Sequence, residues 1–236
     1  MESERLRKIK KENARFEQEA PYNFCDRWCQ RCIAERQNRC RLYLDELEQK
    51  LTCIAYGKEP DDLEITTEVM RQQYEGVEED LEKFIEENGI ELDDLDEGAQ
   101  EAIERQEEFM HNNPLHKTAG QYHNKAHKLL EETFYKKDRA TILCHSEFEV
   151  VAWYHTLLLA KLYMALHGFH EPAVKGDVLL NDAVAQLNVC KKAINESVGA
   201  LRTIGKNFTN YQQQITELIA LLNNIHSRIE LLEQGI

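Results

Sequence analysis

The sequence predicts an all-α fold: a helical bundle that ends in a coiled-coil-like helical hairpin and begins with a cysteine-rich loop. From Leu180 onward, apolar residues recur at the a and d positions of a heptad over more than seven repeats, which is typical of packed helices. No stretch alternates apolar and polar residues with the period of two that marks a strand. At 236 residues, the chain is long enough to bury a core without disulfides.

The chain divides into four parts by composition. Residues 1–20 are charged and poor in apolar positions, which predicts a mobile charged arm or a frayed helix. A four-cysteine loop and a following helix are expected over 21–57, because "YGKEPDD" stops the apolar pattern there. An acidic helical insertion is expected over 58–113 and a helical bundle over 114–236, with Pro114 at the boundary.

The bundle is expected to contain a central helix and a final hairpin. The segment "CHSEFEVVAWYHTLLLAKLYMALHGF" is apolar over more than one narrow stripe, as in a helix packed by neighbours on most sides. The heptads predict two helices, about 177–204 and 208–233, with Gly205 as the stop signal between them. The same heptads also offer an interface for a homodimer.

The charge of the chain is uneven. The formal net charge is −14, and residues 59–109 hold 21 Asp and Glu against the basic residues Arg71, Lys83 and Arg105. Such an acidic block repels phosphate backbones and argues against nucleic-acid binding. It is either a solvated helical face or a docking surface for a basic protein partner. We expect a cytoplasmic protein with no membrane association, because no run approaches the ~18 apolar residues of a membrane span.

Four of the seven cysteines lie close together, at Cys25, Cys29, Cys32 and Cys40. Thiols stay reduced inside the cell, where clustered cysteines bind metal more often than they pair. Three ligands within eight residues and a fourth after a short excursion favour a [4Fe–4S] cluster, with zinc and unmetallated thiols as the alternatives. The other three cysteines are expected to be small buried hydrophobes: Cys53, Cys144 and Cys190.

Two motifs carry a resemblance. The run "CDRWCQRC", followed by a further cysteine, and "WYHTLLLAKLYMAL" at 153–166 resemble a family of uncharacterised bacterial helical proteins that open with CDRWC-x-R-C and carry a later W-Y-H-T helix. The resemblance covers about a third of the chain. It implies a shared cysteine site and says nothing about substrates. The last cysteine spacing is longer here and the acidic block is expanded.

Histidines supply a second candidate site. His123 and His127 share one face of the predicted helix after Pro114, and His155 lies within the apolar central segment. With Glu149 they form a candidate set of metal ligands projecting from two helices, as in bundles that bind iron or zinc. The alternative is that His123 and His127 lie at the surface and that His155 is a hydrogen-bonded core residue.

No familiar catalytic motif accompanies these sites. The chain has no glycine-rich phosphate loop, no G-x-S-x-G, no H-E-x-x-H and no dinucleotide-binding fingerprint, so catalytic residues stay unassigned. The leading hypothesis is a cytoplasmic protein whose iron–sulfur cluster relays electrons or senses redox state toward a protein partner. The alternatives are an enzyme with a His/Glu metal site in the bundle, and a structural or interaction protein with a zinc-stapled N-terminal region.

Overall fold

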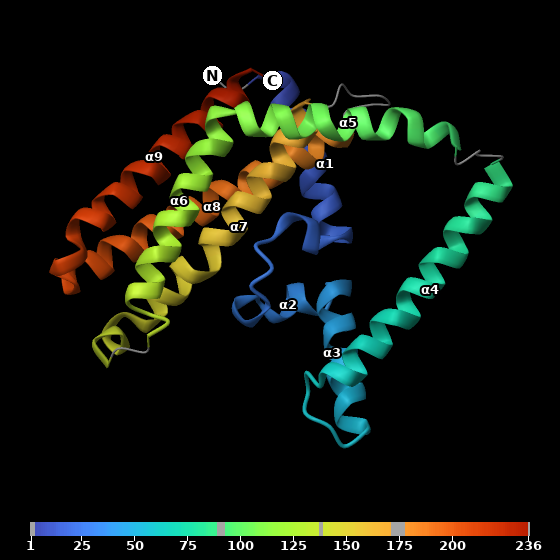
Figure 1. The fold of residues 1–236 in the computed structure, drawn as a ribbon, viewed down its shortest axis with the longest axis horizontal. Helices are drawn as coiled ribbons and strands as arrows, with labels where there is room; N and C mark the ends of the chain where they lie inside the picture. The colour runs from blue at the N-terminus through green and yellow to red at the C-terminus, as the bar shows by residue number, and fades with distance from the viewer. Residues whose placement is uncertain (1–2, 89–92, 137–138, 171–177, 236) are drawn as a thin grey trace. The chain divides into compact units, whose positions relative to one another are not determined.

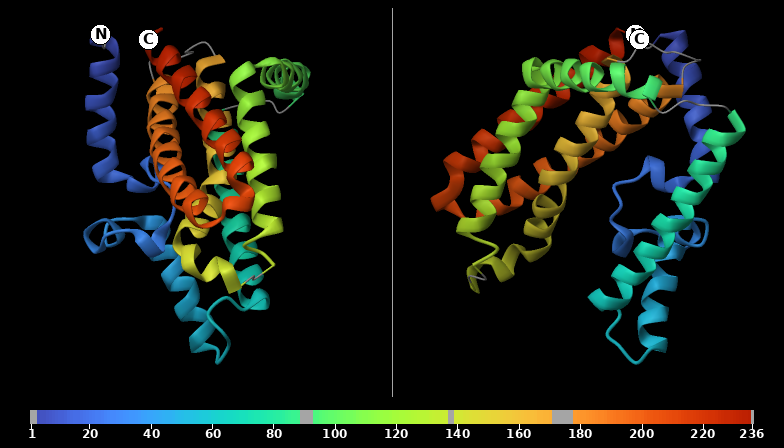
Figure 2. Two further views of the ribbon diagram at one scale, coloured as in Figure 1. Left: turned by 90° about the vertical axis from the view of Figure 1, so that its left-hand side faces the viewer. Right: turned by 45° about the vertical axis from the view of Figure 1, so that its right-hand side comes forward.

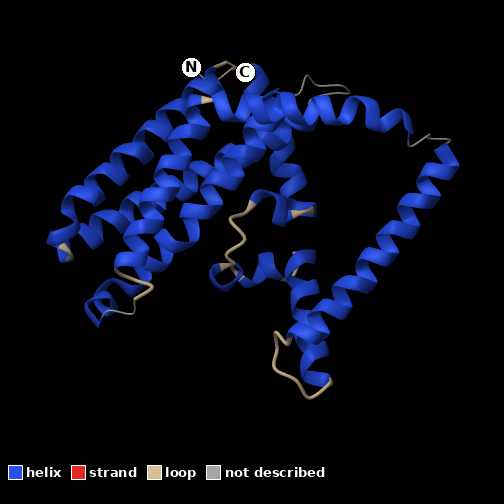
Figure 3. Cartoon of the chain, viewed as in Figure 1, coloured by secondary structure: helices blue, strands red, loops and turns tan. Residues whose placement is uncertain are grey.

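The computed structural model describes residues 3–88, 93–136, 139–170 and 178–235. Those residues form α-helices joined by loops and short 3-10 turns, and no strand occurs among them (Figure 3). The all-α prediction is therefore confirmed for the described part of the chain. None of the described helices is long and apolar enough to cross a membrane.

The chain forms two compact units. The first comprises Met1–Trp28 and Gln106–Ile236, and the second comprises Cys29–Arg105. The first unit is thus built from two separate stretches of sequence. We describe each unit by itself.

Four helices form the bundle of the first unit. In chain order they are α6 (Pro114–Glu132), α7 (His145–His170), α8 (Val178–Asn207) and α9 (Gln212–Gln234). They lie side by side, and consecutive helices run in opposite directions (Figures 1 and 2). The start of α6 is set by Asn113, whose Oδ1 accepts the N–H groups of Leu115 and His116 at 2.9 and 3.3 Å.

Helix α7 is the central helix, as its sequence predicts. It packs on both α6 and α8, and its buried residues lie on more than one side of the helix. This burial removes large apolar side chains from water, each worth roughly 1.5–3 kcal/mol. The α7 side chains that are 1% exposed or less include Phe148, Val151, Tyr154, Leu158, Leu162 and Leu166.

The heptad positions of α8 and α9 face the core of the chain's own bundle. Buried examples are Leu187, Ile194 and Leu201 on α8, with Leu222 and Ile229 on α9. A homodimer through these same positions would require the bundle to open. The coiled-coil character of the hairpin stays a prediction, because burial alone does not define knobs-into-holes packing.

Gly205 does not end a helix, contrary to the sequence-based expectation. Helix α8 continues to Asn207, and the turn Thr209–Tyr211 (η4) leads into α9. A Cβ atom at Gly205 would lie 3.2 Å from Gln212 Oε1 and 3.3 Å from Ile215 Cγ2. The glycine therefore leaves room for the close approach of α9 and does not act as a stop.

Of the two expectations for the N-terminal residues, a mobile arm or a frayed helix, the structure favours a helix over the described residues 3–20. They contain helix α1 (Glu4–Glu19), which packs against α8. Leu6 and Ile9 are buried with Val184, and Asn13 Nδ2 donates to the Asn181 carbonyl at 2.7 Å. These three buried α1 residues form a narrow stripe, and this stripe is the part of an otherwise charged helix that packs on α8.

The second unit has little core of its own. It contains the turn Cys29–Arg31 (η2), α2 (Ala34–Gln37), α3 (Arg41–Ala55) and α4 (Leu63–Asn88), and the following helix α5 (Asp93–Asn112) crosses into the first unit. Helix α3 contacts α4. Among the side chains described in this unit, Cys40 and Cys53 are the buried ones.

Tyr122 in α6 gives a testable pH dependence. Burial raises the pKa of its phenol to about 12, although Ser197 lowers it slightly. Because the pKa is higher in the folded state, the contribution of Tyr122 to the free energy of unfolding is fully present below pH 10. It is lost as the pH rises toward 12. We predict that Tyr122→Phe reduces the loss of unfolding free energy between pH 10 and 11 by about 1 kcal/mol, measured by urea denaturation at both pH values.

The same substitution has a built-in control at neutral pH. Neither Tyr122 Oη nor Ser197 Oγ makes a hydrogen bond of good geometry, so Tyr122→Phe should leave stability at pH 7 within about 0.5 kcal/mol. Burial also raises the pKa of Cys190 to about 12. Its contribution to the alkaline loss of stability should therefore remain in the variant. Identical alkaline profiles for wild type and variant would contradict the assignment.

Candidate functional site

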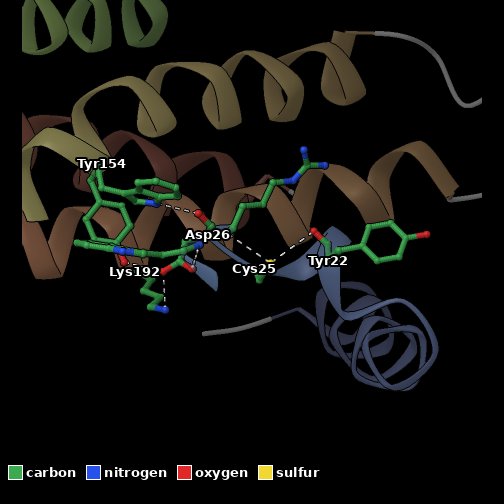
Figure 4. Close-up of polar contacts among 8 residues, drawn as sticks. Tyr22, Cys25, Asp26, Tyr154 and Lys192 are labelled. Atoms are coloured by element: carbon green, nitrogen blue, oxygen red, sulfur yellow. Dashed lines mark hydrogen bonds and ion pairs between the residues drawn. The ribbon is translucent and has the colours of Figure 1, made fainter. Parts of the chain in front are cut away.

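The segment Pro21–Trp28, here called the anchor segment, holds the first cysteine of the cluster against the bundle. It begins with the turn Pro21–Phe24 (η1), which packs on α1 and α8. Gln186 Nε2 on α8 donates to the Asn23 carbonyl at 3.4 Å. Figure 4 shows the segment's polar contacts around Cys25 and Asp26.

Asp26 fixes the anchor segment through its carboxylate. Tyr154 Oη donates to Asp26 Oδ2 at 2.6 Å, and Lys192 Nζ lies 2.7 Å from the same oxygen (Figure 4). Oδ1 accepts the backbone N–H of Trp28 at 3.2 Å. Burial raises the pKa of Asp26, but hydrogen bonds from Lys192, Tyr154 and the Trp28 N–H outweigh that effect, so the net pKa is lowered.

Aromatic side chains hold the far end of the anchor segment. The rings of Trp28 and Trp153 stack with centroids 5.2 Å apart, and Trp28 meets Tyr154 edge-on at 5.9 Å. Trp153 Nε1 also donates to the Asp26 carbonyl at 2.9 Å. The motifs "CDRW" and "WYHT", widely separated in sequence, are therefore in direct contact.

The backbone around Cys25 is shaped to meet its sulfur. Arg27 has φ +54°, the one positive value among non-glycine residues that the structure describes. Its N–H points at Cys25 Sγ at 3.4 Å, and Cys25 Sγ lies 3.6 Å from the Tyr22 carbonyl (Figure 4). A side chain in the left-handed region costs roughly 1 kcal/mol, and such strain persists only where surrounding contacts impose it.

A buried lysine lies near the same cysteine. Lys161 on α7 is 5% exposed. Burial and the charge of Arg27 lower its pKa, while Cys25 and Asp182 raise it. The amine of Lys161 is thus buried in the bundle and interacts with a thiol that the sequence predicts to be a metal ligand.

The other three clustered cysteines belong to the second unit. Cys29 opens η2, and its carbonyl accepts Gln37 Nε2 at 2.8 Å. The Cys32 N–H also donates to the Cys29 carbonyl, at 3.1 Å. Cys40 is the N-cap of α3 and is buried, whereas Cys29 and Cys32 are partly exposed. No disulfide joins any of the seven cysteines, all of which the structure describes.

The remaining cysteines are buried as predicted. Cys53, Cys144 and Cys190 are each at most 1% exposed. Burial raises the pKa of both Cys144 and Cys190. A thiol that stays protonated is a poor ligand and a poor nucleophile, so Cys144 and Cys190 are poorly suited to either role.

Three of the four residues of the predicted histidine set lie together. The ring of His155 stacks on His123 at 5.1 Å and on His127 at 5.7 Å between centroids. Glu149 is not part of this group, because it pairs with His145 at 3.6 Å. Glu149 and His155 are six residues apart, about 1.7 helical turns, so they point to different sides of α7.

The hydrogen bonds of His155 define its tautomer. Its Nδ1 lies 2.7 Å from the Ala152 carbonyl, which can only accept, so Nδ1 carries the proton. Nε2 is then an unprotonated acceptor, and it is buried without a hydrogen-bond partner. Burial lowers the pKa of His155, and the neighbouring His123 and His127 lower it further.

No ready-made metal centre is present in the described residues. Within them, no group of three or more His, Cys, Asp or Glu side chains is placed to hold a metal ion. The histidine rings lie nearly parallel, with interplanar angles of 7° and 18° to His155. Their nitrogens would converge only after side-chain rotation.

The sequence did not reveal the residues that hold the anchor segment. From the sequence alone, Asp26 resembles a spacer between cysteines, and Lys192 resembles one of two adjacent surface lysines. One available signal was that both motifs contain a tryptophan, since large aromatic side chains are often buried in a core or interface. Lys161, a single lysine in the most apolar helix, was a second such signal.

Comparison of the chain with models of protein families, with curated proteins and with solved structures finds no match.

Asp26 gives a direct test of the anchor segment. We predict that Asp26→Ala lowers the free energy of unfolding by about 2 kcal/mol, because it leaves the Tyr154 hydroxyl and Lys192 without their shared acceptor. Trp28 and Trp153 are the two tryptophans of the chain, so loss of their stacking should also change the exciton signal in circular dichroism. Urea denaturation and the spectrum measure the two effects separately.

A matched control is Asp45→Ala, which removes an exposed carboxylate 3.8 Å from Arg41. Exposed pairs of this kind contribute little, about 0.5 kcal/mol or less, and Asp45 has no part in the tryptophan contact. An unchanged exciton signal in Asp26→Ala would show that the stacking holds the segment without the carboxylate.

Proposed function

We propose that this chain is a metal-binding helical protein in which Cys25, Cys29, Cys32 and Cys40 hold a [4Fe–4S] cluster. Its role would be electron relay or redox sensing toward a protein partner, in the cytoplasm, where reduced thiols are available as ligands. The observation that carries the proposal is the anchor segment, in which the motif that contains Cys25 is in direct contact with the second motif.

The surroundings of Cys25 suit a thiolate ligand. The Arg27 N–H directed at Sγ supplies the kind of hydrogen bond that tunes a ligating sulfur. The guanidinium of Arg27 would offset part of the negative charge of a cluster bound by four thiolates, and a negative cluster would favour the charged form of the buried Lys161 amine. A bound cluster supplies one-electron chemistry, and the chain supplies the position and charge of its ligands.

Zinc is the alternative occupant of the same cysteines. Four thiolates also satisfy tetrahedral zinc, in which case the loop is a structural staple and the chain is an interaction protein. The two occupants differ in colour, redox behaviour and metal content. The distinction can therefore be made on purified protein.

The deciding measurement is metal analysis with a visible spectrum on protein purified without oxygen. We predict a broad band near ~400 nm with about four irons per chain, both lost in Cys29→Ser. The matched control is Cys144→Ala, which removes a buried thiol outside the cluster and should keep iron and colour. One zinc per chain and a colourless solution would replace the relay proposal with the structural one.

A second candidate is a metal site, with enzymatic chemistry, at the histidines of the bundle. It is favoured by the buried, unpartnered Nε2 of His155 beside His123 and His127. Imidazole nitrogens suit zinc, iron and related metals. Side-chain rotation would be required before the three nitrogens could share one ion.

Cobalt(II) titration tests this second site. In a variant with all four clustered cysteines replaced by serine, we predict visible d–d bands from one bound Co²⁺, lost in His155→Gln. His226→Gln is the control, because His226 pairs with Glu230 on α9 and lies outside the group. Identical titrations for the two histidine variants would exclude the site.

A further inference from the structure

Helix α4 carries an apolar stripe whose side chains are exposed in the part of the chain that the structure describes. Its members recur at heptad spacing along one side of the helix. Each is more than half exposed, so together they form a contiguous apolar surface of the kind that marks interaction sites. The stripe consists of Leu63, Met70, Tyr74, Val77 and Leu81.

Helix α3 repeats the pattern on a smaller scale. Leu44, Leu47, Leu51 and Ile54 follow one another at intervals of three and four, and each is at least 40% exposed. Since the side chains buried in this unit are those of two cysteines among the residues described, these leucines do not form a core with the α4 stripe. Large apolar side chains left in water on both helices indicate a unit built to be completed by another helix.

The charge beside the stripe limits which helix could complete it. Helix α4 contains nine Asp and Glu residues against Arg71 and Lys83. Arg71 is already paired with Glu68 and Glu75 on the same helix, and Lys83 lies 3.8 Å from Asp80. A second copy of α4 would bring the same excess of negative charge to the interface, which is unfavourable, whereas a helix with basic flanks would be complementary.

We propose that the α4 stripe docks an amphipathic helix with basic flanks, contributed by a partner protein, in a coiled-coil-like pairing. Apolar residues of the partner would cover Met70 to Leu81, and its Lys and Arg side chains would meet the flanking carboxylates. The proposal names the class of partner for the proposed relay and in that sense rests on the proposed function. Docking itself needs no metal.

The test uses two synthetic probes and the full chain. The first probe is a fluorescein-labelled helix of about four heptads with Leu at a and d and Lys at e and g, and the second has Glu at e and g. We expect the full chain to bind the basic probe and not the acidic one, by fluorescence anisotropy. Affinity should fall as NaCl rises toward about 0.3 M, because the flanking charges are screened.

Substitutions separate the stripe from charge alone. Val77→Glu combined with Leu81→Glu should weaken binding of the basic probe at least about tenfold, since two central apolar anchors are lost. Leu231→Glu, at an equally exposed leucine of α9, should bind like wild type. Glu78→Lys keeps the stripe intact and should weaken binding with a smaller salt dependence, and circular dichroism verifies helix content in each variant.

Three outcomes would overturn the proposal. The first is that wild type does not bind the basic probe, and the second is that the double variant binds it as tightly as wild type does. The third is a wild-type dimer in sedimentation equilibrium that the double variant dissolves, which would assign the stripe to a second copy. Cys29→Ser is titrated with the basic probe in parallel. If this variant loses its iron but still binds the probe, docking does not depend on the cluster, and the two proposals can fail independently.

Discussion

The carboxylate of Asp26 is the contact on which the arrangement of the first unit's functional residues depends. One oxygen serves both Tyr154 on α7 and Lys192 on α8, so the two helices and the anchor segment meet at a single charged group. A buried carboxylate is costly unless its partners are all in place. Here they are supplied by a hydroxyl, an ammonium group and a backbone N–H, which makes the position of the neighbouring cysteine a consequence of bundle packing.

Helix α7 links the candidate sites. Trp153, Tyr154 and His155 are consecutive, and they turn toward different neighbours because each step around an α-helix is about 100°. The first two hold the anchor segment, and His155 meets the histidines of α6. A change in the packing of this one helix would therefore be felt at the cysteine and at the histidines together.

Local features of the fold could be predicted from the sequence, and long-range pairings could not. The heptads of α8 and α9 and the apolar breadth of α7 encode helices and burial within a few turns of chain. The packing of helix α1 on α8 was not predicted, because its buried residues Leu6, Ile9 and Asn13 form only a narrow edge. Gly205 was misread because a glycine that leaves room for close packing resembles a helix stop.

The candidate sites show the same division. The clustering of the histidines on α6 followed from helical spacing, but the exclusion of Glu149 required its pairing with His145. The role of Asp26 depends on residues 128 and 166 positions away. No short-range pattern specifies a contact of that span, and an aspartate between two cysteines resembles a linker until its partners are seen.

The split composition of the first unit also sets an order of events during synthesis. Residues 1–28 leave the ribosome first, yet α7 and α8, which hold them, come more than a hundred residues later. Because chains emerge at roughly 5–20 residues per second, the nascent thiols spend several seconds without their scaffold. Closure of the N-terminal segment onto the bundle is thus a late step of folding, and it is the step at which the first cysteine acquires its final surroundings.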